Sequence, residues 1–408
     1  MANANCNCGG RQTTTAVRSI RLAIFAAALA GTAGCQTPGP RLADPTRAVW
    51  VTRFDYRTAD DVVRIMDDCK RAGLNTVVFQ VRGNGTAFYR SRLEPWAEEL
   101  GGKDPGFDPL ELACREAHAR DMQLHAWVNV MPAWRGTKLP KSPNQLLYRH
   151  PEWFWYDQHG DRQQLSDFYV SLNPSLPEVR RYIVSVFREI VAGYDVDGLH
   201  LDYVRFPNEP PATPRGSDID YSQDARTLAQ FKRDTGHTPE SDPDGWKRWR
   251  AEQVTKLVSD IKSMIRWTKP HVALTAAVGS KPEGPLERHY RDSGRWAQEK
   301  LIDAVFPMNY HAETFNERAK AWAEAKSPVP VVTGINVGRN DAATVAGQID
   351  FSRGLTPHFC LFAYSALFDR RASETAPAET QPTPRSARSA ELIEKLQAVA
   401  DSDGRPSR

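Results

Sequence analysis

Eight strand-like runs alternate with amphipathic helical patterns along most of this chain, and this alternation limits its folds more than any other feature. A run that is apolar throughout is typical of a strand buried on both faces, and an intervening helix makes consecutive strands parallel. Eight such repeats predict an α/β fold of the (β/α)8 TIM-barrel type rather than an open doubly wound sheet. The expected strands cover residues 47–53, 74–82, 123–129, 196–207, 271–278, 302–310, 329–336 and 359–364.

The barrel domain is expected to span residues 47–370, with an aromatic-rich insertion at 131–168 after the third strand. Loops of that length inside compact domains are usually functional. Residues 35–46 are polar and contain proline, which is typical of a tether. Residues 371–408 have the composition of a low-complexity tail, within which an amphipathic pattern at 390–400 predicts a short last helix that docks on the domain.

Residues 1–34 have the pattern of a bacterial signal peptide. Arginines precede an apolar run at 22–30, which is too short to span a membrane, and small residues then lead to Cys35. This ending resembles a lipoprotein signal, in which Cys35 becomes the lipidated first residue; an ordinary signal peptide cut nearby is the alternative. Gln36 resembles the residue that follows the cysteine in outer-membrane lipoproteins. We therefore expect a lipid anchor to the membrane, in the cell envelope and facing the periplasm.

Composition argues against several classes of protein. The net charge is +3, and no Lys/Arg-rich tract occurs in the body of the chain, so nucleic acid is not an expected partner. No histidine cluster has metal-site spacing, and no Gly-x-Ser-x-Gly elbow is present, so we predict neither a metal, nor a cofactor, nor a serine hydrolase. Three cysteines are expected to be small buried residues: Cys69, Cys114 and Cys360.

Polar side chains stand where the predicted strands end. In a barrel these carboxyl ends converge on one active face. The fourth strand ends in Asp202, Tyr203 and Arg205, which we interpret as a reacting centre; the alternative is that Asp202 caps a loop or pairs with Arg205. Amides, phenols and guanidinium groups suit a hydroxyl-rich ligand, and arginines suit an anionic group. The other strand-end candidates are Arg53, Gln80, Arg82, Asn129, Asn309, Tyr310 and Tyr364.

Several motifs match one known family. They include Arg47-Ala-Val-Trp50, Pro95-Trp96 and the runs at 74–81, 104–110, 125–129 and 197–203. These motifs resemble the glycosyl-hydrolase-like 10 family, bacterial envelope proteins of the DUF187 type, over residues 47 to about 365. The resemblance implies a TIM-barrel glycosidase acting on envelope glycan, with peptidoglycan glycan strands as the substrate. It also implies that Asp202 is the catalytic aspartate and that Trp127 and Asn129 belong to the site.

Glycoside hydrolysis normally needs two carboxyl groups. Asp202 supplies one, as nucleophile or base. Glu283 lies nearest to the end of the fifth strand and is the predicted partner; Asp55, Glu94 and Glu313 are the other candidates.

The end of the fourth predicted strand matches only part of the catalytic motif of chitinase-like barrels. Asp197-Gly198 and Asp202 fit its frame, but His200 and Val204 replace two of its acids, which argues against that substrate-assisted mechanism.

The sequence thus predicts an envelope-anchored glycoside hydrolase that cleaves peptidoglycan glycan strands or a related amino-sugar polysaccharide. Residues 153–156, which are all aromatic, are expected to line glycan subsites. A non-catalytic glycan-binding or scaffold lipoprotein on the same barrel is the alternative, because no second acid is obvious. A transglycosidase would differ only in its acceptor.

Overall fold

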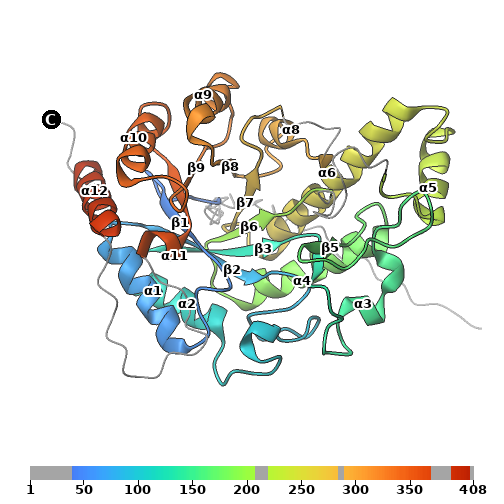
Figure 1. Cartoon of the computed structure of the whole chain (residues 1–408), viewed down its shortest axis with the longest axis horizontal. Coiled ribbons are helices and arrows are strands. Elements are labelled where there is room, and N and C mark those ends of the chain that lie inside the picture. Colours follow the sequence, from blue (N-terminus) through green and yellow to red (C-terminus); the bar gives the residue numbers. More distant parts are fainter. Residues whose placement is uncertain (1–38, 207–218, 284–288, 369–386, 405–408) are drawn as a thin grey trace, which may run out of the picture. The chain divides into compact units, whose positions relative to one another are not determined.

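The computed structural model describes residues 39–206, 219–283, 289–368 and 387–404, so the predicted signal peptide and Cys35 lie outside the described residues. Eight parallel strands close into a barrel, in the order β1-β10-β9-β8-β7-β6-β3-β2. The predicted TIM-barrel fold is confirmed (Figure 1). The barrel strands are β1 (Arg47–Val51), β2 (Thr76–Arg82), β3 (Gln123–Asn129), β6 (Gly198–Asp202), β7 (Ala273–Val278), β8 (Ala304–Asn309), β9 (Thr333–Asn336) and β10 (Phe359–Phe362).

Helices surround the barrel (Figure 1). Local signals set their ends: Thr58 and Asp61 form a capping box at α1, and Asp108, Asp224 and Asp341 cap α2, α5 and α10. No helix within the described ranges is both long and apolar enough to cross a membrane. The helices are α1 (Ala59–Arg71), α2 (Pro109–His118), α3 (Leu146–Arg149), α4 (Pro177–Gly193), α5 (Ala225–Thr235), α6 (Pro243–Thr268), α8 (Ser293–Gln298), α9 (Phe315–Glu324), α10 (Ala342–Arg353), α11 (Tyr364–Phe368) and α12 (Ala387–Asp403).

The insertion after β3 is an ordered layer over the barrel. Strands β4 (Pro132–Arg135) and β5 (Tyr169–Ser171) pair antiparallel, and α3 and the short helix η2 (Pro151–Trp153) lie between them. Its aromatic residues are largely core: Phe154 and Trp155 are fully buried, and the Trp155 ring lies 4.2 Å from that of Phe206. The main work of these rings is therefore to hold the insertion together.

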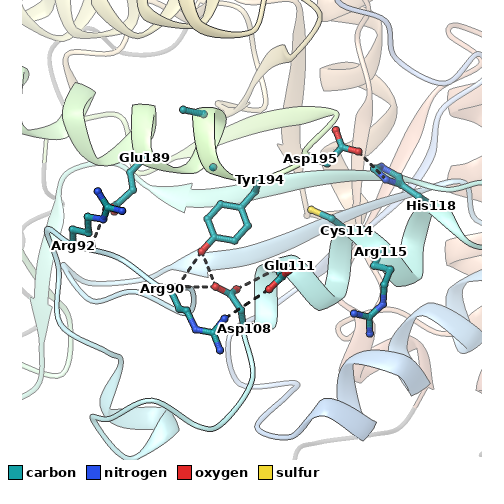
Figure 2. Close-up of a pocket in the computed structure, with 12 residues that line it drawn as sticks. Arg90, Arg92, Asp108, Glu111, Cys114, Arg115, His118, Glu189, Tyr194 and Asp195 are labelled. Carbon is teal, nitrogen blue, oxygen red and sulfur yellow. Dashed lines mark hydrogen bonds and ion pairs between the residues drawn. The ribbon is translucent and has the colours of Figure 1, made fainter.

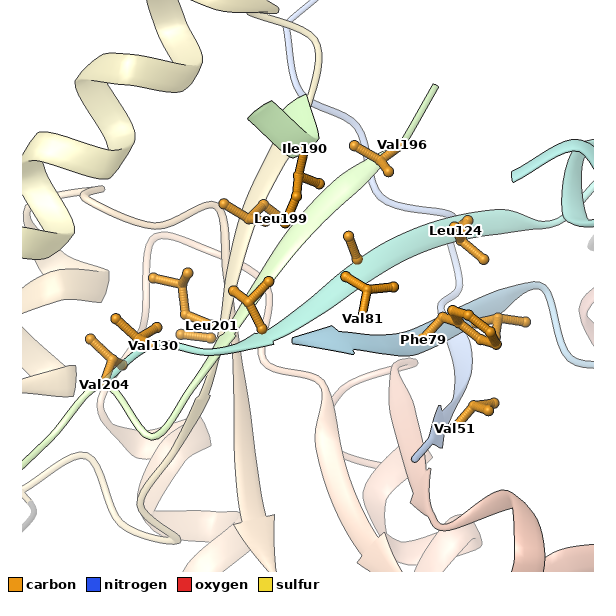
Figure 3. Packing of buried hydrophobic residues seen from close by; sticks show 14 of the residues in the cluster. Val51, Phe79, Val81, Leu124, Val130, Ile190, Val196, Leu199, Leu201 and Val204 are labelled. Atoms are coloured by element: carbon orange, nitrogen blue, oxygen red, sulfur yellow. The ribbon is translucent and has the colours of Figure 1, made fainter. Parts of the chain in front are cut away.

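Alternate residues of the barrel strands belong to two separate hydrophobic clusters. One cluster faces the surrounding helices and includes Val51, Phe79, Val81, Leu124, Leu199 and Leu201, together with Ile190 of α4 (Figure 3). The other fills the barrel interior and consists of Ala48, Trp50, Val78, Trp127, Ala304, Phe306, Val332 and Cys360. Burial on both faces explains why these strands are apolar throughout. Cys69, Cys114 and Cys360 are all buried and free, as predicted.

Large rings in the interior are accommodated by glycines. A Cβ on Gly334 would lie 3.0 Å from the Trp50 ring, and one on Gly198 would lie 2.6 Å from the His125 ring. The Trp50 indole N–H donates to Nε2 of His200 at 3.1 Å, so the proton of that neutral imidazole is on Nδ1, 2.9 Å from Thr275 Oγ1. Burial holds the pKa of His200 well below its ordinary value. This chain of hydrogen bonds fixes the position of Trp50.

Both ends of the described chain pack at the amino ends of the strands. The Ala43 N–H donates to Gln123 Oε1 at 2.9 Å, the Thr46 N–H donates to His358 Nδ1 at 3.0 Å, and Leu42 packs against the interior cluster. Helix α12 contains the pattern predicted at 390–400, and Asp403 in its last turn pairs with Arg47 at 2.8 Å. The last residues before β1 are thus part of the folded domain.

Gly198→Ala is expected to lower the free energy of unfolding by about 1–3 kcal/mol, because the new methyl group would overlap the buried His125 ring. Gly347→Ala is the matched control: it lies on the exposed side of α10 with nothing within 4 Å, and it should be neutral or stabilising. Urea denaturation of both variants measures the difference. Equal effects would show that the interior is not packed in this way.

Candidate active site

A cavity of about 240 Å³ opens at the carboxyl ends of the barrel strands. Among the described residues its lining includes one carboxylate, together with guanidinium groups, amides and several aromatic rings. The lining residues are Trp50, Thr52, Arg53, Phe54, Gln80, Trp127, Asn129, Tyr169, Asp202, Tyr203, Arg205, Ala277, Met308, Tyr310 and Phe362. Eight residues predicted from the sequence are therefore brought together: Arg53, Gln80, Trp127, Asn129, Asp202, Tyr203, Arg205 and Tyr310.

Asp202 is the last residue of β6, and its side chain is buried. Oδ1 accepts the backbone N–H of Tyr203 at 2.6 Å. Burial raises the pKa of Asp202 above its ordinary value, against the opposing effects of that N–H and of Arg205 and Arg291. A buried carboxyl group with a raised pKa at the mouth of a barrel is suited to proton transfer or to nucleophilic attack.

The residue after Asp202 has an unusual backbone. Tyr203 has a φ of 50°, in the left-handed region that side chains rarely adopt. Its ring packs edge-on against Tyr169, with centroids 4.9 Å apart, and the Arg205 guanidinium lies 4.8 Å from its centroid. The sharp turn ends β6 and keeps three polar side chains at the mouth. Such conformations persist where the surroundings enforce them, often at functional sites.

One wall of the cavity is a network of polar side chains. The Arg53 Nε donates to Glu99 at 2.9 Å, and its Nη1 donates to the Tyr169 hydroxyl at 3.1 Å. Although burial opposes the charge of Arg53, Tyr169 and Glu99 hold its pKa above the ordinary value. Gln80 donates to Asn129 Oδ1 at 3.2 Å. These contacts position a guanidinium and two amides before any ligand arrives.

Another part of the cavity lining is a group of packed aromatic rings. Tyr310 stacks on Phe362 with ring centroids 5.2 Å apart, and both rings lie edge-on to Trp50. The Trp127 indole N–H is near enough to favour the charged form of Asp202, and it has no other hydrogen-bond partner in the described part of the chain.

Arg291, just before α8, is a feature that the sequence patterns did not point to. It is buried against Gly279, at the end of β7, and its Nη1 has no hydrogen-bond partner within the described residues. Burial and the nearby charge of Arg205 lower the pKa of Arg291 to about 9, while Asp202 opposes that shift. The pair of arginines makes this side of Asp202 electropositive.

Comparison with known proteins identifies the family of this barrel. The model of the family described as "Glycosyl hydrolase-like 10" matches residues 45–350. The chain belongs to this family. Among its relatives, the glycosyl hydrolase DigH of Escherichia coli (strain K12) is 28% identical over 327 residues, which cover 70% of this chain and 71% of DigH. The glycosyl hydrolase YngK of Bacillus subtilis (strain 168) is 29% identical, covering 67% of this chain and 55% of YngK.

Solved structures of glycosidases share the fold of this family member. The catalytic domain of a β-amylase from Paenibacillus polymyxa has a TM-score of 0.58 at 10% identity, covering 89% of this chain and 99% of that domain. An α-L-fucosidase from Paenibacillus thiaminolyticus has a TM-score of 0.59 at 13% identity, covering 88% of this chain and 50% of that chain. At such low identities the likeness concerns the barrel alone.

Three predicted binding residues of the glycosyl hydrolase-like barrel lie outside the cavity lining. Arg82 is buried and pairs with Glu94 through two nitrogens, Nε at 2.9 Å and Nη2 at 2.7 Å. The Asn309 side chain donates to the Phe315 carbonyl at 2.8 Å, and the Tyr364 hydroxyl donates to Asp68 at 2.8 Å. Each of these side chains is engaged in holding a loop or helix in place.

The second carboxyl group is not among the residues that line the described cavity. Glu283, its predicted source, is exposed and adjoins residues outside the described ranges, and Glu313 is also exposed. Glu94 is engaged by Arg82. Asp55 is buried beside the cavity, where its Oδ2 accepts the N–H and hydroxyl of Thr52 at 2.7 and 2.9 Å, and burial raises its pKa to about 6.

A larger cavity of the described structure lies elsewhere. A groove of about 930 Å³ runs along the outer faces of α2 and α4, away from the strand ends. Its polar groups contact one another: the Tyr194 hydroxyl donates to Asp108 at 2.7 Å, Arg90 lies 3.9 Å from Glu111, and His118 lies 3.6 Å from Asp195 (Figure 2). Size alone therefore does not make this groove the reactive site.

Asp202→Asn is expected to raise the melting temperature at about pH 8. The raised pKa of Asp202 means that its buried negative charge destabilises the fold, and this cost disappears as falling pH protonates the group. The gain should therefore shrink towards about pH 4. Asp341→Asn is the control with opposite sign, because Thr344 lowers the pKa of that exposed residue. A loss of stability in Asp202→Asn at pH 8 would contradict the prediction.

Proposed function

We propose that this protein is a glycoside hydrolase that cleaves glycosidic bonds in peptidoglycan glycan strands or a related amino-sugar polysaccharide. Its family membership and its similarity to the glycosyl hydrolases DigH and YngK support the reaction class. The observation that carries the proposal is the buried carboxyl group of Asp202, with its raised pKa, in a cavity of amides, guanidinium groups and aromatic rings.

In this proposal Asp202 is the nucleophile or the general base. The amides of Gln80 and Asn129 and the indole N–H of Trp127 bind sugar hydroxyl or acetamido groups, and the rings of Trp50 and Tyr310 contact the apolar face of the sugar. Glu283 stays the predicted acid partner. The separation of its carboxyl group from that of Asp202 would decide between inversion and retention of configuration.

A carboxylate on the glycan would be held by the electropositive side of the cavity. Arg53 and Arg205 line the cavity, and Arg291, which interacts electrostatically with both Arg205 and Asp202, has an Nη1 without a hydrogen-bond partner among the described residues. A buried guanidinium group is costly to desolvate unless an anion pairs with it. The arrangement thus favours a glycan that carries negative charge.

A second candidate function is non-catalytic glycan binding on the same barrel. The specific observation in its favour is that Asp202 is the one carboxylate among the lining residues of the described cavity. Binding needs only the amides, arginines and rings, whereas hydrolysis needs a second acid or base.

We further propose that the protein is held in the cell envelope by a lipid on Cys35 and faces the periplasm from the outer membrane. The charged, apolar and small-residue pattern that ends at Cys35 supports this location, and Gln36 supports the outer membrane over the inner. Such an anchor would keep a hydrolase close to its polymeric substrate.

The proposed reaction predicts release of new reducing ends from purified sacculi, either intact or stripped of stem peptides. Asp202→Asn should lower the rate at least about a hundred-fold, because it removes the reacting carboxyl group. Asp341→Asn, the same change at an exposed helix cap, should keep the full rate. Far-UV circular dichroism of each variant confirms that it is folded.

Two results would change the assignment. Full activity in Asp202→Asn would show that another group is the catalytic carboxylate. Binding of sacculi by the parent protein, with no reducing ends released from either preparation, would favour the non-catalytic function.

Cys35→Ser is expected to abolish incorporation of radioactive palmitate and to move the protein from the membrane fraction to the soluble periplasmic fraction, because the thiol that carries the lipid is absent. Cys6→Ser and Cys8→Ser, which change cysteines upstream of the proposed cleavage site, serve as controls and should retain the label. Label retained in Cys35→Ser would exclude lipidation at this residue.

A further inference from the structure

A second cavity, of about 330 Å³, opens on the same end of the barrel and has a different lining. It lies between the loop that follows β2 and the insertion that follows β3. Its volume is within the range of roughly 300–1,000 Å³ that is typical of small-ligand sites. The lining residues are Thr86, Trp96, Glu98, Gly101, Gly102, Trp134, Pro140, Lys141, Ser142, Pro143 and Gln145.

Two indole rings contribute the apolar surface of this cavity. Trp96 is half-buried, and Trp134 is buried with its N–H donated to the Lys138 carbonyl at 2.8 Å. The negative face of an aromatic ring attracts the weakly positive C–H groups of a sugar. A half-exposed tryptophan in a cavity on the active face is therefore suited to stacking against a pyranose ring.

The polar groups of the cavity suit a neutral, hydroxyl-rich ligand. One oxygen of Glu98 accepts the Lys141 N–H at 2.8 Å, which leaves its second oxygen for a ligand hydroxyl. Gly101 and Gly102, with φ values of 82° and 68°, follow at the rim, and a Cβ on either would have nothing within 4 Å. Backbone without side chains at this rim keeps the cavity open to a bulky ligand.

The walls are held in place without a ligand. The backbone flanking Trp96 is fixed on both sides by Ala87, whose N–H donates to Pro95 at 2.9 Å and whose carbonyl accepts from Ala97 at 3.0 Å. In the facing wall, Gln145 accepts the Leu147 N–H at 2.6 Å and donates to the carbonyl of Ala133. Binding to such a preformed site costs little ordering entropy.

One short helix separates this cavity from the one that contains Asp202. Helix η1 (Glu98–Leu100) contributes Glu98 to the second cavity, while its next residue, Glu99, pairs at 2.9 Å with Arg53 of the first. The two cavities thus share a wall and open on the same end of the barrel. A polymer that crosses this short helix would contact both cavities.

We propose that the cavity between Trp96 and Trp134 is a distal sugar-binding subsite, which holds a neutral pyranose unit of the same glycan chain that is cleaved at Asp202. This inference rests on the proposed function, since it assumes a glycan substrate. The subsite adds affinity only for chains long enough to reach both cavities, and so makes the protein selective for long glycan strands.

The test measures binding of peptide-free glycan strands and of their disaccharide repeat unit to the full chain carrying Asp202→Asn, so that cleavage does not interfere. Adding Trp96→Ala should raise the Kd for long strands about three- to ten-fold, because one stacking surface is lost, and leave the Kd for the disaccharide unchanged. Trp96→Leu, which keeps apolar volume towards the core, should have the same effect.

The matched control is Trp267→Leu, which removes a tryptophan that is 90% exposed at the far end of α6. It should change neither Kd. An unchanged Kd for long strands in both Trp96 variants, or an equal loss for strands and disaccharide, would overturn the subsite while leaving the proposed function in place. No binding of either glycan by the parent protein would overturn both. Binding that depends on Trp96, without hydrolysis by the wild-type chain, would support the subsite and overturn the hydrolase.

Discussion

Closure of the sheet by the pairing of β1 with β10 is the constraint on which the rest of the structure depends. A closed barrel has no unpaired edge, and it forces every second side chain of each strand into one shared interior. Closure also brings the carboxyl ends of all eight strands to one rim. Arg53 follows β1 and Asp202 ends β6, on well-separated strands, yet both line one cavity because the sheet curves back on itself.

The same interior atoms serve both stability and the site. Trp50 donates to His200 and packs closely against Gly334, and its ring is also part of the cavity lining. Asp202, unlike Trp50, lowers the stability of the fold when it is charged, because burial disfavours its carboxylate form. The cavity thus combines a rigid aromatic floor with a carboxylate that the fold does not stabilise, a balance common at catalytic sites.

The barrel and much of the cavity could be predicted because strand periodicity is simple: alternate residues point inward, and polar residues at strand ends reach the rim. Arg82 lies outside the cavity lining, at a point where the register shifts between Gln80 and Arg82, a local irregularity that no apolar pattern records. Tyr364 lies beyond the end of β10 and turns back to Asp68. Arg291 could not be found, since it precedes a short helix and reaches Asp202 only through the tertiary fold.

The packing of residues 41–46 against the amino ends of the strands determines how far the cavity lies from any attachment point upstream in the chain. The cavity opens at the other end of the barrel, so a support joined to the chain upstream would hold the domain by its base, with the opening directed outward. With the proposed attachment at Cys35, the distance over which the site could act is the height of the barrel plus the few residues between Cys35 and Arg41, at most about 3.5 Å per residue. Under the proposed attachment at Cys35, the protein would act on polymer lying roughly one domain height above the membrane, rather than on molecules at its surface.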